Sequence, residues 1–202
     1  MEKYSSFYKK ACYAGKRWLD SIKTDKLKVV ADELMKLGNM DWVVWSLAQP
    51  ETAQLLLDRR ANVNATNKYG NTALIWAASC GHTETVKLLV DRGADVNVIN
   101  KYGNTAVMWA ALNGYTKIVK LLLNRGANVN AVNKHGNTTL MWAAWNGHTK
   151  IVNLLVDRGA NVNVVDENGY TALMWAMMNG HAETVKLLKD IINRVAVRTI
   201  GI

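Results

Sequence analysis

Long apolar runs are missing from this chain of 202 residues, since none approaches the roughly 18 residues that a membrane-spanning helix needs. We therefore expect no transmembrane segment. Residues 1–18, MEKYSSFYKKACYAGKRW, contain scattered charges and no continuous apolar core, so we expect no secretory signal either. Half of the residues are nevertheless apolar and a fifth are charged, which is typical of a globular rather than a disordered chain.

Cysteine, proline and phenylalanine are all scarce. The two cysteines, Cys12 and Cys80, lie in different segments without the close spacing of a metal site, so we interpret both as reduced thiols of an intracellular protein. Proline and phenylalanine occur once each, whereas tryptophan occurs eight times. So uneven an aromatic composition indicates that part of the chain has been copied.

The net charge of +9 is concentrated near the N-terminus, where residues 1–28 hold eight Lys/Arg and three Asp/Glu. Such an excess favours an acidic partner, a phosphate backbone or an anionic membrane. The signal is weak, because many soluble proteins are equally basic.

The chain repeats itself with a period of 33 residues. Three residue types mark the copies: Gly70, Gly103, Gly136 and Gly169; Thr72, Thr105, Thr138 and Thr171; Trp76, Trp109, Trp142 and Trp175. In the first full copy, turn-forming residues precede Thr72, which can cap a short helix that ends at Gly81. A second helix is predicted from Thr83 to Gly93. A unit of this size cannot bury its own apolar face, so neighbouring copies must stack.

The shared pattern G-x-T-x-L-x-x-A-A-x-x-G-H-x-x-x-V-x-L-L-x-x-x-G-A-x-V-N resembles the ankyrin repeat over about residues 38–190. The resemblance implies an all-α ankyrin-repeat solenoid of about five helix-turn-helix repeats with an N-terminal helical hairpin cap. We divide the chain into that cap (1–37), a degenerate repeat (38–66), full repeats (67–99, 100–132 and 133–165) and a repeat with a divergent C-terminal cap (166–202).

Both ends are expected to cover the stack. Apolar or small residues between Tyr4 and Ile22 form one helical stripe opposite basic residues, and a second helix follows from Asp25 to about Gly38. An N-terminal cap is the plain interpretation, and the less favoured alternative is a membrane-recruited adaptor that uses residues 3–22. We expect residues 186–202 to extend the last outer helix and to cover the final repeat.

The resemblance also implies a concave face, lined by hairpin tips and the ends of inner helices, where family members bind other proteins. Trp142 recurs in every full copy and is assigned to the core, whereas Trp145 does not recur and is assigned to the contact surface. The candidate protein-binding residues are Lys68, Tyr69, Lys101, Tyr102, Leu112, Asn113, Lys134, His135, Trp145, Asn146, Tyr170 and Met178. Apolar and aromatic side chains on a rigid surface are typical of interaction hot spots.

No catalytic or metal-binding pattern is recognised. His82, His148 and His181 share one repeat position, but equivalent residues of stacked repeats lie about 10 Å apart. Ligands of one zinc ion lie about 2 Å from it, so we interpret these histidines as loop-packing residues. A phosphate-binding glycine loop and a G-x-S-x-G motif are both missing. We expect neither an enzyme nor a cofactor.

These features predict a non-catalytic protein-binding module, monomeric and cytoplasmic, that acts as a scaffold, adaptor or inhibitor. The alternative is a nucleic-acid or phospholigand binder that uses Lys68, Lys101, Lys134 and the tyrosines beside them, with an affinity that falls with salt. The near-identical, Asn- and Lys-rich copies resemble ankyrin proteins of host-associated bacteria and large viruses. Delivery into a host cell as an effector is therefore a further hypothesis.

Overall fold

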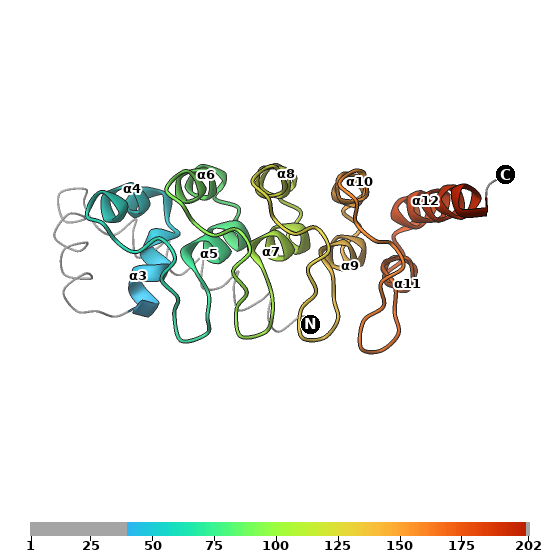
Figure 1. The fold of residues 1–202 in the computed structure, drawn as a ribbon, viewed down its shortest axis with the longest axis horizontal. Coiled ribbons are helices and arrows are strands. Elements are labelled where there is room, and N and C mark those ends of the chain that lie inside the picture. The colour runs from blue at the N-terminus through green and yellow to red at the C-terminus, as the bar shows by residue number, and fades with distance from the viewer. Residues whose placement is uncertain (1–39, 201–202) are drawn as a thin grey trace. The chain divides into compact units, whose positions relative to one another are not determined.

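The computed structural model describes residues 40–200, and the chain divides between Lys101 and Tyr102 into two units. Within residues 40–200 the regular structure is helical throughout, which confirms the predicted all-α fold class (Figure 1). No helix in this range is both long and apolar enough to cross a bilayer. The N-terminal cap predicted for residues 1–37, including the basic stripe of residues 3–22, lies outside the described residues.

The first unit contains two helix pairs. Helix α3 (Met40–Leu47) packs on α4 (Pro50–Asp58), and α5 (Ala73–Cys80) packs on α6 (Thr83–Asp91). Helix α3 also contacts α5, and α4 contacts α6. The first helices of the pairs, which we call the inner helices, therefore form one row, and the second helices, which we call the outer helices, form another. The segment predicted as a degenerate repeat therefore folds into a helix pair like the full copies.

The second unit contains three helix pairs: α7 (Ala106–Leu112) with α8 (Thr116–Asn124), α9 (Thr139–Trp145) with α10 (Thr149–Asp157), and α11 (Ala172–Met178) with α12 (Ala182–Ile200). Helix α9 packs between α7 and α11, and α10 packs between α8 and α12. In Figure 1 the hairpin loops of this unit project from the inner row, away from the outer helices. Helix α12 reaches Ile200, which confirms the predicted extension of the last outer helix.

Threonine caps begin the inner helices of all four copies, as predicted. Each hydroxyl accepts a hydrogen bond from the backbone N–H three residues ahead: Thr72 from Ile75 (3.3 Å), Thr105 from Met108 (3.4 Å), Thr138 from Met141 (3.2 Å) and Thr171 from Met174 (3.3 Å). The bond satisfies a donor that the first turn of a helix leaves without a partner. Gly81 ends α5 in the left-handed conformation, with φ of 83°, which glycine adopts without a steric penalty.

Stacking buries the apolar residues that a single copy leaves uncovered. Trp76, Trp109 and Trp175 are buried and Trp142 is half-buried, so the recurring tryptophan belongs to the core as predicted. Fully buried aliphatic residues fill the space between the helix rows: Leu56, Leu74 and Leu89 in the first unit, and Ile118, Leu122, Leu140, Ile151, Leu155 and Leu188 in the second. Each unit therefore has its core between the inner and outer helices.

Asparagines of the V-N pairs join one repeat to the next, although the sequence indicated only a role in turns. The Asn130 side chain donates from Nδ2 to the carbonyl oxygen of Gly159 (3.0 Å) and accepts at Oδ1 from the backbone N–H of Asn161 (2.9 Å). Asn64 makes the equivalent two bonds within the first unit. One amide side chain thus bonds both a donor and an acceptor of the following turn.

Replacing Asn130 with alanine is expected to lower the free energy of unfolding by about 1 kcal/mol, because two exposed hydrogen bonds between repeats are lost. Urea denaturation followed by circular dichroism measures the change. Asn163 occupies the same position in the next copy, where α12 replaces the turn of a following repeat. Asn163→Ala should therefore cost less than about 0.5 kcal/mol. Equal losses of stability in the two variants would show that the hydrogen bonds from Asn130 to the following turn do not stabilise the stack.

Candidate functional site

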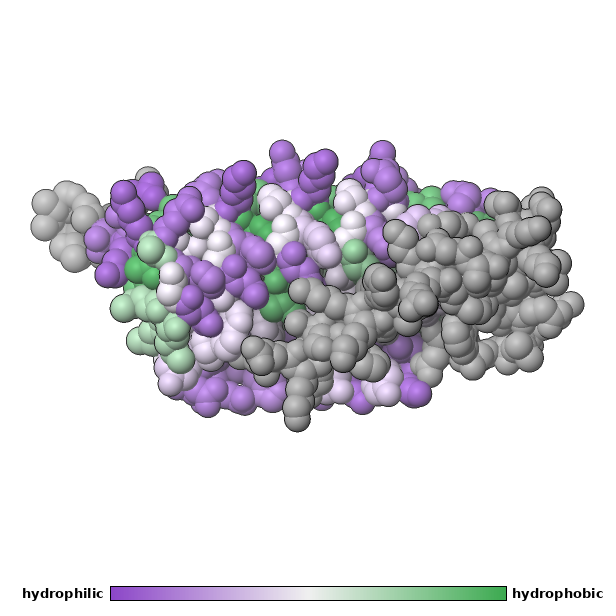
Figure 2. All heavy atoms as spheres, turned by 180° about the vertical axis from the view of Figure 1, so that it is seen from behind, coloured by the Kyte–Doolittle hydropathy of each residue, from purple (hydrophilic) through white to green (hydrophobic). Residues whose placement is uncertain are grey.

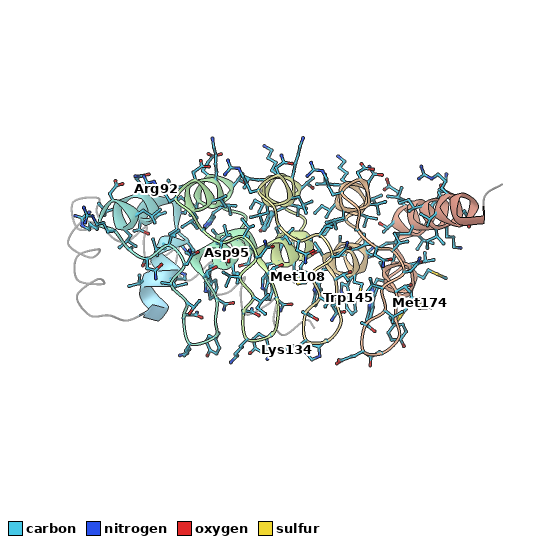
Figure 3. All side chains as sticks on the ribbon, viewed as in Figure 1. Arg92, Asp95, Met108, Lys134, Trp145 and Met174 are labelled. Atoms are coloured by element: carbon cyan, nitrogen blue, oxygen red, sulfur yellow. The ribbon has the colours of Figure 1, made fainter. Side chains whose placement is uncertain are left out.

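Three apolar side chains end the inner helices of the second unit and form what we call the apolar strip: Leu112 of α7, Trp145 of α9 and Met178 of α11. Leu112 and Trp145 are half-buried, and Met178 is exposed. Because α9 packs between α7 and α11, the three residues stand on neighbouring helices (Figure 3). Accessible apolar side chains on a rigid row of helices are suited to contact with a protein.

The Trp145 ring rests against the next repeat. Its centroid lies 4.4 Å from that of Trp175, with the planes tilted by 51°, and the Tyr170 ring lies 5.1 Å from Trp175 on the same measure. Trp175 is buried, and its indole N–H donates to Asp166 Oδ2 at 3.0 Å. Tilted ring pairs at this distance attract one another beyond simple area burial. Trp145 therefore packs on an aromatic ring that a buried hydrogen bond holds in place.

Histidines of the following repeats hold the backbone of the apolar strip. His148 Nε2 lies 3.2 Å from the carbonyl oxygen of Leu112, and His181 Nε2 lies 2.8 Å from that of Trp145. A carbonyl oxygen only accepts, so the ring N–H donates in both cases. These carbonyls belong to helix ends, where no partner exists within the helix. The predicted role of the histidines in packing loops is confirmed, and it extends to positioning Leu112 and Trp145.

Asparagines that follow the apolar strip cap their own helices. Asn113 Nδ2 donates to the carbonyl oxygen of Trp109 (3.1 Å), and Asn146 Nδ2 donates to that of Trp142 (3.2 Å). The last inner helix repeats the pattern at Asn179. The sequence indicated Asn113 and Asn146 only as contact residues and missed this role. Part of their hydrogen-bonding capacity is used within the fold, and their contact with a partner stays a prediction.

Hairpin tips of the second unit carry charges of both signs. His135 Nδ1 lies 2.9 Å from Glu167 Oε1, and both side chains are exposed. The backbone N–H of Lys134 donates to the carbonyl oxygen of Tyr102 (3.1 Å), and that of Glu167 donates to the carbonyl oxygen of His135 (3.0 Å), which aligns successive tips. Lys134 is exposed at its tip (Figure 3). Within this unit, the positively charged tip at Lys134 is therefore followed by a tip that carries the carboxylate of Glu167.

Tips of the first unit bring two lysines to one aromatic ring. Lys101 Nζ lies 4.2 Å from the centroid of the Tyr69 ring, and Lys68 Nζ lies 5.3 Å from it. Both distances are within the range of cation–π attraction. Lys68, Tyr69 and Lys101 thus lie together at the tips of the first unit. That Lys134 of the second unit belongs to the same binding surface stays a prediction.

Cys80, at the end of α5, differs from its predicted state. It is disulfide-bonded in the structure, so the expectation of a reduced thiol at this position is wrong. Spacing along the sequence tests for a metal site but carries no information about a long-range disulfide. The chain's other cysteine, Cys12, lies outside the described residues. Among residues 40–200, no group of His, Cys, Asp or Glu side chains is arranged to hold a metal ion.

Comparison with known families agrees with the helix pairs and their caps. The family model described as ankyrin repeats (3 copies) matches residues 42–133 and 126–196. Together the two matches span residues 42–196 of the 202. Among curated proteins, none matches the chain. The period of 33 residues, the stacked helix pairs and the family match lead to one conclusion: the chain belongs to the ankyrin-repeat family.

Proposed function

We propose that this chain is a non-catalytic binding module that recognises another protein through the apolar strip of Leu112, Trp145 and Met178 and the hairpin tips of the second unit. Ankyrin repeats generally bind other proteins. In this role the chain acts as a scaffold, adaptor or inhibitor. The proposed place of action stays the cytoplasm, either of the producing cell or of a host cell into which the chain is delivered, although the disulfide at Cys80 is more typical of an oxidising compartment.

The observation that carries this proposal is that contacts with the following repeat hold the Trp145 side chain and backbone in place. Its ring lies against that of Trp175, and its carbonyl oxygen is held by His181. A large aromatic side chain that is held in place before binding loses little conformational entropy on contact. Tryptophan is also among the residues most enriched in the energetic centre of interfaces. Trp145 therefore has the features of an anchor residue.

The hairpin tips support the nucleic-acid alternative less well. Lys101 Nζ lies 4.2 Å from the centroid of the Tyr69 ring, so a base that stacked on this face of the ring would have to displace the lysine. In the second unit, a phosphate backbone following the tips would meet the carboxylate of Glu167. We therefore retain nucleic-acid binding only as an outcome of the test.

Capture of partners from cell lysate by the wild type and by Trp145→Ser tests the proposal. Serine stands at the equivalent position of the first full copy, Ser79, so the substitution is compatible with the repeat. We expect the variant to bind its protein partner about 30-fold more weakly, the effect of losing about 2 kcal/mol at a hot spot. The captured protein, identified by mass spectrometry, should persist after nuclease treatment and at high salt.

A matched control removes apolar volume elsewhere on the second unit. Leu154, half-buried on the outer helix α10, is replaced by alanine, and partner capture should remain at the wild-type level. Circular dichroism establishes that both variants are folded. Unchanged capture by Trp145→Ser would contradict the proposal. Partners that disappear with nuclease or salt would instead support the nucleic-acid alternative.

A further inference from the structure

We propose that Asn168, at the hairpin tip of the last repeat, is a site of spontaneous deamidation, and that hydrogen bonds of the fold protect the other asparagines of the same kind. Asparagine reacts fastest when glycine follows it, because glycine has no Cβ atom to hinder ring closure. The chain contains four such pairs, all in the second unit, at Asn113, Asn146, Asn168 and Asn179. The inference goes beyond the proposed function, because it concerns a covalent change of this chain and not the recognition of a partner.

The reaction needs water and no other reactant. The backbone nitrogen of Gly169 attacks Cγ of the Asn168 side chain, and the proton that it loses leaves with the side-chain NH2 group as ammonia. One C–N bond forms as another breaks, which gives a five-membered succinimide ring. Water then adds to one of the two ring carbonyls and opens the ring, which gives aspartate or isoaspartate. No atom is oxidised or reduced in either step.

The hairpin tip holds the backbone of Asn168 and leaves its side chain unrestrained. Asn168 and Gly169 are both exposed, and a Cβ atom at Gly169 would meet nothing within 4 Å. Hydrophilic side chains line the lower edge of the second unit, where its hairpin tips lie (Figure 2). The backbone N–H of Asn168 donates to Asp166 Oδ1 at 2.9 Å, but its carboxamide makes no hydrogen bond to any residue of the described range 40–200. The carboxamide can therefore rotate toward the nitrogen of Gly169.

Carboxamides of the other three pairs are hydrogen-bonded to the helices that they follow. Asn179 Nδ2 donates to the carbonyl oxygen of Trp175 at 2.8 Å. Asn113 and Asn146 make the equivalent bond at 3.1 Å and 3.2 Å. This bond must break before the side chain can rotate for ring closure, which slows the reaction roughly fivefold (about 1 kcal/mol).

Asn179 is the closest internal control. Asn179 and Gly180 are exposed, so α12 leaves this end of α11 accessible, and the expectation that the C-terminal segment covers the final repeat is wrong there. A Cβ atom at Gly180 would also meet nothing within 4 Å. The backbone N–H of Gly180 donates to the carbonyl oxygen of Met177 at 3.1 Å, as that of Gly169 does three residues back at 2.9 Å. The two pairs therefore differ mainly in the hydrogen bond of the carboxamide.

The last hairpin tip differs from the preceding ones in carrying a reactive pair. The residue before the tip glycine is Tyr69, Tyr102 or His135 in the preceding copies and Asn168 in the last copy. None of the three earlier residues has a carboxamide, so the reaction is confined to a single tip. Deamidation adds a carboxylate beside that of Glu167, and the tip becomes more acidic.

Asp166 connects this modification to the candidate site. Its Oδ1 accepts from the backbone N–H groups of Asn168 (2.9 Å) and Tyr170 (3.0 Å). Isoaspartate adds one carbon to the main chain between these two groups, so both bonds cannot keep their geometry. Oδ2 of the same carboxylate holds the Trp175 indole, on which Trp145 packs. The expected effect on partner binding, which rests on the proposed function, is weaker capture.

Peptide mapping by mass spectrometry tests the proposal on the purified full chain after incubation in mildly alkaline buffer. Fragment ions locate the modified residue, and electron-based fragmentation distinguishes aspartate from isoaspartate. Asn168 should be converted at least about fivefold faster than Asn179. In concentrated urea, where the fold is lost, the two rates should be similar. Asn168→His, which introduces the residue of the preceding tip, should abolish the reaction there and leave the rate at Asn179 unchanged.

The rates in the folded and the unfolded chain decide the outcome. Equal rates at Asn168 and Asn179 in the folded chain would overturn the proposal. An undiminished preference for Asn168 in urea would also overturn it, because the neighbouring residues and not the hydrogen bonds would then cause the selectivity. These measurements involve no partner, so failure of deamidation and failure of the proposed function are distinguishable. Unchanged partner capture by a converted sample, compared with Asn168→His incubated in the same way, would contradict the connection through Asp166.

Discussion

Replacing Asp166 with alanine is expected to lower the free energy of unfolding by about 3 kcal/mol. Asp166 is buried and accepts three hydrogen bonds, two at Oδ1 from the backbone N–H groups of Asn168 (2.9 Å) and Tyr170 (3.0 Å) and one at Oδ2 from the Trp175 indole (3.0 Å). Alanine would leave these donors without their acceptor. A buried donor that loses its partner retains the full cost of its desolvation.

Asp166→Asn is the matched control, because the other copies have asparagine at this position. Asn133 shows what the amide can do there: its Oδ1 accepts from the backbone N–H groups of His135 and Asn137, each at 3.0 Å, and its Nδ2 donates to Asn104. Asparagine at position 166 should keep the two backbone bonds and lose the acceptor for Trp175. We expect a loss of about 1 kcal/mol, less than half that of alanine.

Urea denaturation followed by circular dichroism measures both losses. The alanine variant should also increase the mobility of Trp175, which time-resolved anisotropy detects if the other tryptophans are replaced or labelled selectively. Equal stability of the wild type and Asp166→Ala would show that water replaces the carboxylate without cost. Equal losses for alanine and asparagine would instead assign the whole effect to the indole bond.

Replacing Gly147 with alanine should lower the free energy of unfolding by about 3 kcal/mol, from backbone strain and a steric clash together. Gly147 has φ of 67°, in the left-handed region that side chains disfavour. A Cβ atom there would lie 2.5 Å from His181 Nδ1 and 2.7 Å from Cγ of the same ring. Relief of that clash requires the ring to move and weakens its bond to the Trp145 carbonyl oxygen.

Gly159→Ala separates the two contributions. Gly159 also has a left-handed φ, of 85°, but a Cβ atom there would meet nothing within 4 Å. Its expected loss is about 1 kcal/mol, which comes from backbone strain alone. Because Gly147→Ala also shifts His181, it should weaken partner capture, whereas Gly159→Ala should not. Equal losses of stability would show that His181 moves aside freely and does not hold Trp145.

Repeat architecture was predictable from the sequence because its signals are local. Thr72 caps α5 through a bond to a backbone group three residues away, and Gly81 ends that helix through its own left-handed conformation. The recurrence of Trp76 and its equivalents at a period of 33 residues identified a core position without knowledge of the neighbouring repeats. Helix α12 was also predictable, since glycine and the usual turn residues are missing where it continues.

The candidate site was predictable only in part. Sequence variation at one repeat position identified Leu112, Trp145 and Met178 as candidates. It could not show that the Trp145 ring packs on Trp175, or that His181 donates a hydrogen bond to the Trp145 carbonyl oxygen. Residues 30 and 36 positions apart make these contacts, and their geometry depends on how two repeats stack. The capping role of Asn113 and Asn146 was missed because asparagine is common in turns as well as at helix ends.

The sequence by itself determined the repeat unit, its helices and caps, and the residue types that face a neighbouring unit. Tertiary structure decided which of those faces are covered. Met141 and Met174 stand at the same repeat position in helices of the same length, yet one is buried beneath α11 and the other is largely accessible. The sequences around Met141 and Met174 are similar, but the burial of each methionine depends on whether another repeat packs against its helix.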